Sequence, residues 1–144
     1  MKRNLHARLT VLALVLLVAG CGGNKPSEDV KLGGIALTDV LDGLMVRTKQ
    51  ALAGIRSMET AQASVPRLVE INDDFEDLRY HAPKLSPAGQ DELAKSARKH
   101  QPEVVAMVRA VRDSPALYDI MGEEMEKMLG QLNWLMAPPF AAEE

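Results

Sequence analysis

The side chains that could do chemistry are few in this chain of 144 residues. It contains one cysteine, Cys21, and three histidines, of which His100 falls within an apolar helical pattern. A single cysteine excludes an intramolecular disulfide and a cysteine-based metal site. If the chain folds into helical hairpins, His100 lies level with Met125 and Met128 on a later helix and with Met45 on an earlier one. These four residues are the candidate metal or cofactor site.

Such a site could bind copper(I), because soft sulfur ligands suit that ion. It could also hold b-type haem through one histidine and one methionine, as four-helix cytochromes do. The other interpretation is packing, since methionine is adaptable core filler and Asn72 could satisfy a buried histidine. Packing without a cofactor is our leading interpretation, and copper or haem bound by His100 and the methionines is the alternative.

Enzyme signatures are absent from the sequence. It has no Gly-rich phosphate loop, no Gly-x-Ser-x-Gly and no His-Glu-x-x-His. The acidic run 73–77 lacks the alternation and the central glycine of a calcium loop, so a solvated helix face explains it. His81 lies at a predicted helix end, where the helix dipole favours it. We therefore expect a protein that is not an enzyme and has no catalytic residues.

The charge balance argues against two kinds of partner. The chain has 17 Lys and Arg against 20 Asp and Glu, a net charge of −3. Lys2, Arg3 and Arg8 lie in a removable leader, so 14 basic residues remain and the net charge falls to −6. An acidic domain without a Lys/Arg cluster lacks the electrostatic footprint of a nucleic-acid binder and has little attraction to anionic lipid.

Four segments show apolar residues at alternating steps of three and four, which is the spacing of a buried helix face. Ser86 and Ser114, each followed by proline, mark helix starts, and Thr38 is a plausible N-cap of the first helix. The aromatic content of 3% favours an aliphatic core and helix-on-helix packing. The four stripes are Leu37, Leu41, Leu44, Thr48, Ala51 and Ile55; Ala61, Leu68, Ile71, Phe75, Leu78 and Ala82; Leu93, Ala97, His100, Val104, Met107 and Val111; Tyr118, Met121, Met125, Met128, Leu132 and Leu135.

These helices predict an all-α fold, an antiparallel up-down four-helix bundle over residues 36–136. The second and third helices would pack as a hairpin that turns near Ser86. Pro102 falls inside the third helix, which predicts a kink or break nearby, whereas Pro66 fits the opening turns of the second. The Pro-rich tail 137–144 is expected to be disordered.

The first 20 residues have the pattern of a secretory signal peptide. A basic segment is followed by an uncharged apolar run over residues 9–19, which is too short to span a membrane. Residues 21–35 then contain several glycines, one proline and no apolar period, so they are expected to form a flexible linker.

The junction Val18-Ala19-Gly20-Cys21 resembles the lipobox of bacterial lipoproteins. This resemblance covers only the leader. It implies cleavage between Gly20 and Cys21, diacylglyceryl transfer to the Cys21 thiol, and N-acylation with a fatty acid such as palmitate. Because Gly22 and not Asp follows the cysteine, it also implies the periplasmic face of the outer membrane, or the outer face of the plasma membrane in an organism with one membrane.

Together these observations predict a lipid-anchored envelope lipoprotein whose helical domain binds or scaffolds a periplasmic protein. Tyr80 and Trp134 are the candidate contact residues, because aromatic side chains with polar groups are enriched in binding hot spots. For Trp134, closing the end of the bundle is the leading interpretation, and a partner contact is the alternative. Besides copper or haem, carriage of an apolar ligand between the helices is a third possibility, favoured only by the methionines of the fourth stripe.

Overall fold

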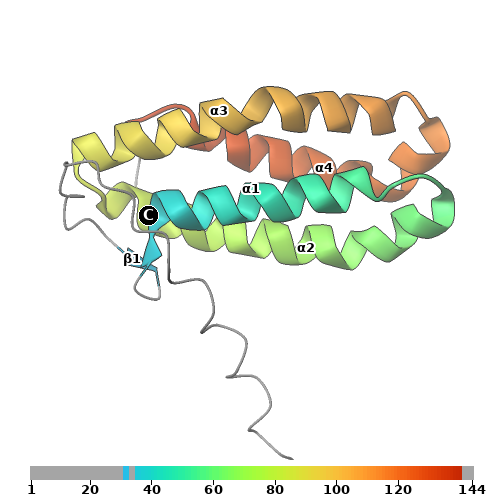
Figure 1. Cartoon of the computed structure of the whole chain (residues 1–144), viewed down its shortest axis with the longest axis horizontal. Coiled ribbons are helices and arrows are strands. Elements are labelled where there is room, and N and C mark those ends of the chain that lie inside the picture. Colours follow the sequence, from blue (N-terminus) through green and yellow to red (C-terminus); the bar gives the residue numbers. More distant parts are fainter. Residues whose placement is uncertain (1–30, 33–34, 141–144) are drawn as a thin grey trace, which may run out of the picture.

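The computed structural model describes residues 31–32 and 35–140, and four helices make up most of this part of the chain. The predicted all-α helical bundle is confirmed (Figure 1). The predicted leader, Gly20 and Cys21 lie outside the described residues, as do residues 141–144 of the predicted tail. The helices are α1 (Leu37–Ala53), α2 (Met58–His81), α3 (Pro87–Arg112) and α4 (Pro115–Leu135), with a 3-10 helix η1 (Ala82–Lys84) between α2 and α3.

The predicted stripes form the core of the bundle. Every residue of the first two stripes is buried, and each large apolar side chain removed from water contributes about 1.5–3 kcal/mol. In the third stripe, His100 and Met107 are only half-buried, and Val108 is buried instead. In the fourth stripe, Tyr118 is half-buried and the other residues are buried. Helical periodicity therefore identified nearly all of the core.

Local hydrogen bonds fix where α2 and α3 begin. Ser57 and Thr60 form a capping box: Thr60 N donates to Ser57 Oγ at 3.2 Å, and Ser57 N donates to Thr60 Oγ1 at 2.9 Å. Ser86 caps α3 as predicted, because its Oγ accepts a hydrogen bond from Gly89 N at 3.1 Å.

The start of α1 differs from the prediction. Strands β1 (Lys31–Leu32) and β2 (Ile35–Ala36) pair antiparallel, with Leu32 opposite Ile35. This pairing carries the chain up to α1, whose N-cap is Ala36, so Thr38 is not the N-cap. The predicted linker over residues 21–35 therefore includes β1 and the first residue of β2. The sequence did not reveal these strands, because strands of two residues are too short to show a recognisable alternation.

The helices alternate in direction along the chain, but consecutive helices are not always neighbours (Figure 1). Both α1 and α4 pack against α2 and α3, whereas the pairs α1–α4 and α2–α3 make the fewest contacts and lie on the diagonals. The expected hairpin of the second and third helices is therefore wrong. Because η1 carries the chain across a diagonal, two of the four helix interfaces join parallel helices.

Contacts between side chains display these parallel interfaces. Between α1 and α3, Asp42 contacts His100, and Lys49 Nζ contacts Glu103 Oε2 at 2.8 Å further along both helices. Between α2 and α4, Asn72 contacts Glu124. One turn later, Lys127 Nζ lies 2.9 Å from Glu76 Oε1.

Two prolines lie inside helices without interrupting them. α3 continues through Pro102, so the expected break is absent, and Pro66 lies well inside α2 and not in its opening turns. A proline removes the hydrogen bond to the carbonyl four residues earlier. Both prolines are exposed, as are Gln62 and Arg98, the residues that bear those carbonyls. Water can therefore satisfy the carbonyls, which lowers the cost of each proline.

Candidate functional site

Tyr80, near the C-terminal end of α2, is the most exposed large hydrophobic side chain among the described residues, at 69%. The ammonium group of Lys84 lies 3.6 Å from the centre of its ring, and the His81 ring meets it edge-on at 5.1 Å. The cation–π contact and the edge-on ring restrict the ring while leaving it open to solvent. Tyr80 is thus a restrained, accessible aromatic side chain.

Trp134, in contrast, is covered by its own neighbours. Its ring stacks on Phe140 with centroids 4.7 Å apart, and the Arg79 guanidinium lies 4.8 Å from its centroid. Phe140 is itself only 6% exposed, and its N–H donates to Gln90 Oε1 at 3.0 Å. Of the two predicted contact residues, Trp134 therefore closes the end of the bundle, and Tyr80 stays open.

The same contacts correct the prediction of a disordered tail for residues 137–140. These residues fold back on the bundle end, where Arg98 Nη2 donates to Met136 O at 2.6 Å and Phe140 buries its ring. The cause is the aromatic stacking between Phe140 and Trp134, which the proline content of the tail does not reveal.

The ends of several elements meet where the chain enters the bundle (Figure 1). β1 and β2 precede α1 at this end, and α2 finishes there with Tyr80. Ile35, on β2, leaves 46% of its surface exposed. The end of the bundle that carries β1, β2 and Tyr80 is therefore the end to which the N-terminal segment is attached.

His100, the predicted ligand, lies at the boundary between α1 and α3. Its Nε2 is 2.9 Å from Asp42 Oδ1, and Ser96 Oγ donates to the same oxygen at 2.6 Å. The polar partner of His100 is thus Asp42 and not Asn72, because α2 and α3 are diagonal. A serine hydrolase would need the Ser hydroxyl on the imidazole, whereas here both side chains bind the carboxylate.

Burial raises the pKa of Asp42, but this effect is outweighed. The hydrogen bonds from Ser96 and His100, together with the nearby charge of Lys99, hold the pKa of the Asp42 carboxyl below its ordinary value of 3.8. The carboxylate therefore stays ionised in the fold and links α1 to α3.

The predicted thioether ligands lie in the core. Met45, Met125 and Met128 are all fully buried, within one continuous hydrophobic cluster. Met45 is one turn from Asp42, so its height along the bundle is close to that of His100. The Nε2 atom of His100 is nevertheless engaged by Asp42, and a ligand role for His100 requires this contact to open or Nδ1 to serve instead.

Acidic side chains gather on α2 without forming a metal site. Within residues 31–32 and 35–140, no group of three or more His, Cys, Asp or Glu side chains is arranged to hold a metal ion. In the run 73–77, Phe75 is fully buried, as the second stripe predicts. Asn72 instead donates to Glu124 Oε2 at 2.6 Å, so it fastens α2 to α4.

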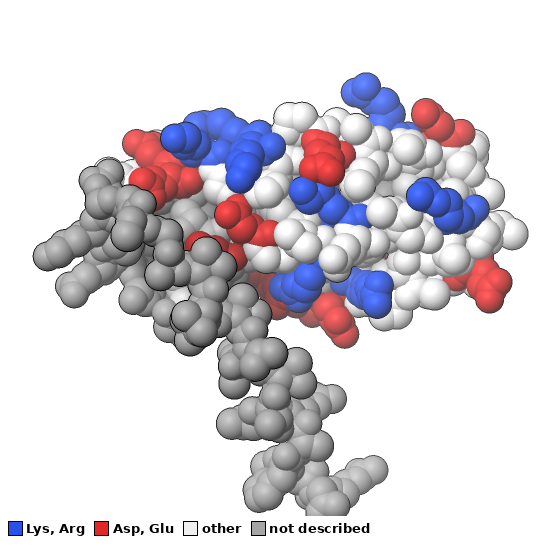
Figure 2. Space-filling model, viewed as in Figure 1, with Lys and Arg blue, Asp and Glu red and all other residues white. Residues whose placement is uncertain are grey.

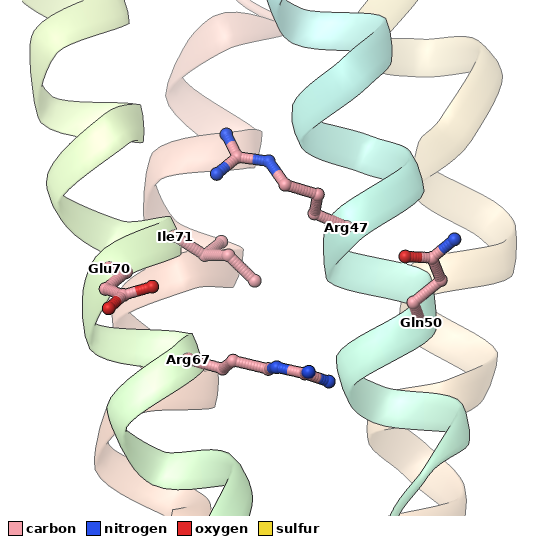
Figure 3. Close-up of a pocket in the computed structure, with 5 residues that line it drawn as sticks. All are labelled: Arg47, Gln50, Arg67, Glu70 and Ile71. Carbon is pink, nitrogen blue, oxygen red and sulfur yellow. The ribbon is translucent and has the colours of Figure 1, made fainter. Parts of the chain in front are cut away.

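A pocket of about 250 Å³ lies in the groove between α1 and α2, and the sequence did not reveal it (Figure 3). Arg47 and Gln50 line it from α1, and Arg67, Glu70 and Ile71 line it from α2. Ile71 belongs to the second stripe, and helical spacing places the other four residues beside a buried stripe. Only the pairing of α1 with α2 brings them together.

The remaining surface on this side carries dispersed charges. Figure 2 shows Lys, Arg, Asp and Glu side chains scattered over the face on which α1 lies, with broad uncharged areas between them. None of the helices in the described ranges combines the length and the hydropathy needed to cross a membrane.

Comparisons with protein-family models, curated proteins and solved structures found no match for this chain.

Proposed function

We propose that this chain is a lipid-anchored lipoprotein of the bacterial envelope whose helical bundle binds another envelope protein and has no catalytic activity. The observation that carries the anchoring is the sequence Val18-Ala19-Gly20-Cys21 directly after a basic segment and an apolar run. Acyl chains on Cys21 would bury many methylene groups at about 0.8 kcal/mol each, so the anchor would be lasting.

The position of the bundle end supports a partner close to the membrane. Residues 22–30 separate Cys21 from β1 and span at most about 32 Å when fully extended. The end that carries β1, Ile35 and Tyr80 would therefore stay near the lipid surface (Figure 1). On the periplasmic face of the outer membrane, this end would meet proteins embedded in or bound to that membrane.

Tyr80 supports the position of the contact. Its ring is exposed, carries a hydroxyl and is held by Lys84 and His81, so little rotational freedom is lost on binding. Truncating an aromatic hot-spot residue typically costs about 2 kcal/mol, or roughly thirtyfold in affinity.

The experiment places a photo-cross-linking amino acid at Tyr80 in the full chain, produced at its native level in its own cells. The matched position is Val69, which is also exposed on α2 but lies well before the helix end. We expect one protein to cross-link from position 80 and not from position 69.

The protein identified in this way is then tested with the purified full chain. Tyr80→Ala should weaken binding at least tenfold, whereas Val69→Ala should leave the affinity unchanged. A chain that cross-links to nothing, or to the same proteins from both positions, would contradict the proposed contact.

A further inference from the structure

Two of the residues that line the pocket between α1 and α2 are arginines, one on each helix. Figure 3 shows the Arg47 side chain reaching from α1 towards α2 and the Arg67 side chain reaching from α2 towards α1. Ile71, which is 3% exposed, lies between them as an apolar base. The two guanidinium groups therefore flank one small volume.

The two arginines differ in how many hydrogen bonds their guanidinium groups already make within the protein. Arg47 Nη2 pairs with Asp74 Oδ2 at 2.7 Å, and both side chains of this pair are about half exposed. The Arg67 side chain makes no hydrogen bond or ion pair with any residue in the described part of the chain, although Glu70 is only one turn away. Arg67 thus has its full set of five N–H donors available for a ligand.

We propose that this pocket binds the oxyanion group of a small soluble molecule, a carboxylate or a phosphate. The planar guanidinium matches both groups through paired N–H···O hydrogen bonds. Arg67 supplies the free donors, and Arg47 adds a second positive charge from the facing helix. Ile71 offers apolar contact to the carbon skeleton of the ligand.

Glu70 sets the charge that the pocket accepts. Its carboxylate lines the same pocket from α2 and repels a second negative group on a ligand. A ligand with one oxyanion and an otherwise neutral or positive body is therefore favoured over a polyanion. Removing the charge of Glu70 should strengthen the binding of a simple anion, and this sign is specific to the proposed site.

The test follows the arginine Nε–Hε resonances by NMR while inorganic phosphate or acetate replaces chloride at constant ionic strength. The full chain is used, in detergent micelles. We expect the Arg67 and Arg47 signals to move along saturating curves, and the Arg109 signal to stay in place. Arg109 is the matched control, because it is exposed on α3 and its side chain makes no hydrogen bond or ion pair with the described residues.

Substitutions then assign the binding to the pocket. Arg67→Gln should weaken it by about two- to fivefold, as for the loss of one exposed charge pair, and Arg109→Gln should leave it unchanged. Glu70→Gln should tighten binding by a similar factor. Because these side chains lie outside the core, thermal unfolding of the three variants should match that of the unsubstituted chain.

Two outcomes would overturn the proposal: shifts of Arg67 and Arg109 that rise together without saturating, or an Arg67→Gln variant that binds as well as the original. Binding of acetate alone would identify the ligand group as a carboxylate, and binding of phosphate alone as a phosphate. Failure with both anions would also reject the site. None of these results depends on the lipid anchor or on the contact at Tyr80.

Discussion

Nε2 of His100 and Oδ1 of Asp42 lie 2.9 Å apart and join α3 to α1, two helices that run in the same direction. Ser96 donates to the same carboxylate oxygen one turn earlier on α3. This contact explains why the third stripe contains a histidine at a half-buried position. The imidazole pairs with a carboxylate on the neighbouring helix.

The first prediction concerns the pH dependence of stability. The pKa of Asp42 is lower in the folded chain than its ordinary value of 3.8. The ionised carboxylate therefore contributes fully to the free energy of unfolding above about pH 3.8, and this contribution is lost as the pH falls through the pKa of the folded chain. Asp42→Asn should lower the free energy of unfolding at pH 7 by about 1 kcal/mol, the usual effect of a lost hydrogen bond.

Urea unfolding at pH 7 and at pH 3 measures this effect. The variant should lose less stability between the two values than the original chain does. Asp91→Asn, at an exposed position on α3, is the control and should behave as the original. An Asp42→Asn variant with unchanged acid sensitivity would refute the role given to this carboxylate.

The second prediction concerns the bundle end. Trp134 is the sole tryptophan of the chain, so its fluorescence reports directly on its surroundings. Phe140→Ala should expose the Trp134 ring, shift its emission to longer wavelength and cost about 1–3 kcal/mol, from lost burial and lost stacking. Tyr80→Ala is the control, because it removes an exposed ring and should change neither the Trp134 emission nor the stability. An unshifted emission in Phe140→Ala would show that residues 137–140 do not cover Trp134.

The third prediction compares two glycines inside helices. A Cβ atom at Gly43 would meet nothing within 4 Å, so Gly43→Ala should stabilise the chain by about 0.5–1 kcal/mol. A Cβ atom at Gly122 would lie 3.0 Å from the ring of Tyr118, whose hydroxyl donates to Glu126. Gly122→Ala should therefore displace Tyr118 and lower stability, by about 1 kcal/mol.

Thermal unfolding of the two variants decides this comparison. The melting temperatures should move in opposite directions, upwards for Gly43→Ala and downwards for Gly122→Ala. Equal gains would mean that Tyr118 moves aside freely and that its bond to Glu126 contributes nothing.

The fourth prediction tests the copper alternative. Because Asp42 engages His100 and the methionines are packed in the core, we expect weak copper(I) binding that is the same for the full chain, His100→Ala and Met125→Leu. Anaerobic titration against a colorimetric chelator measures it. Tight binding by the original chain that is lost in both variants would instead establish the metal site.

The fold was predictable where it depends on local periodicity. Stripes such as Leu37 to Ile55 mark a buried face because side chains three and four residues apart share one side of a helix. The pairing of helices was not predictable in this way. A short connection such as η1 fixes the reversal of direction but not whether the next helix lies beside the previous one or across the diagonal.

This diagonal connection also decides which candidate site residues meet. It separates Asn72 on α2 from His100 on α3 and gives His100 the partner Asp42. The pocket at Arg47 and Arg67 depends in the same way on the contact between α1 and α2. Tyr80 was proposed as a contact residue from its side-chain type alone, which does not depend on how the helices pair.

The lipid anchor at Cys21 is tested most directly by the intact mass of the chain extracted from the membranes of the bacterium that makes it. The account predicts a chain that begins at Cys21 and carries a diacylglyceryl group and an N-linked acyl chain, and that needs detergent to leave the membrane. A chain that begins at another residue, or an unmodified Cys21 in a protein released by buffer alone, would contradict it.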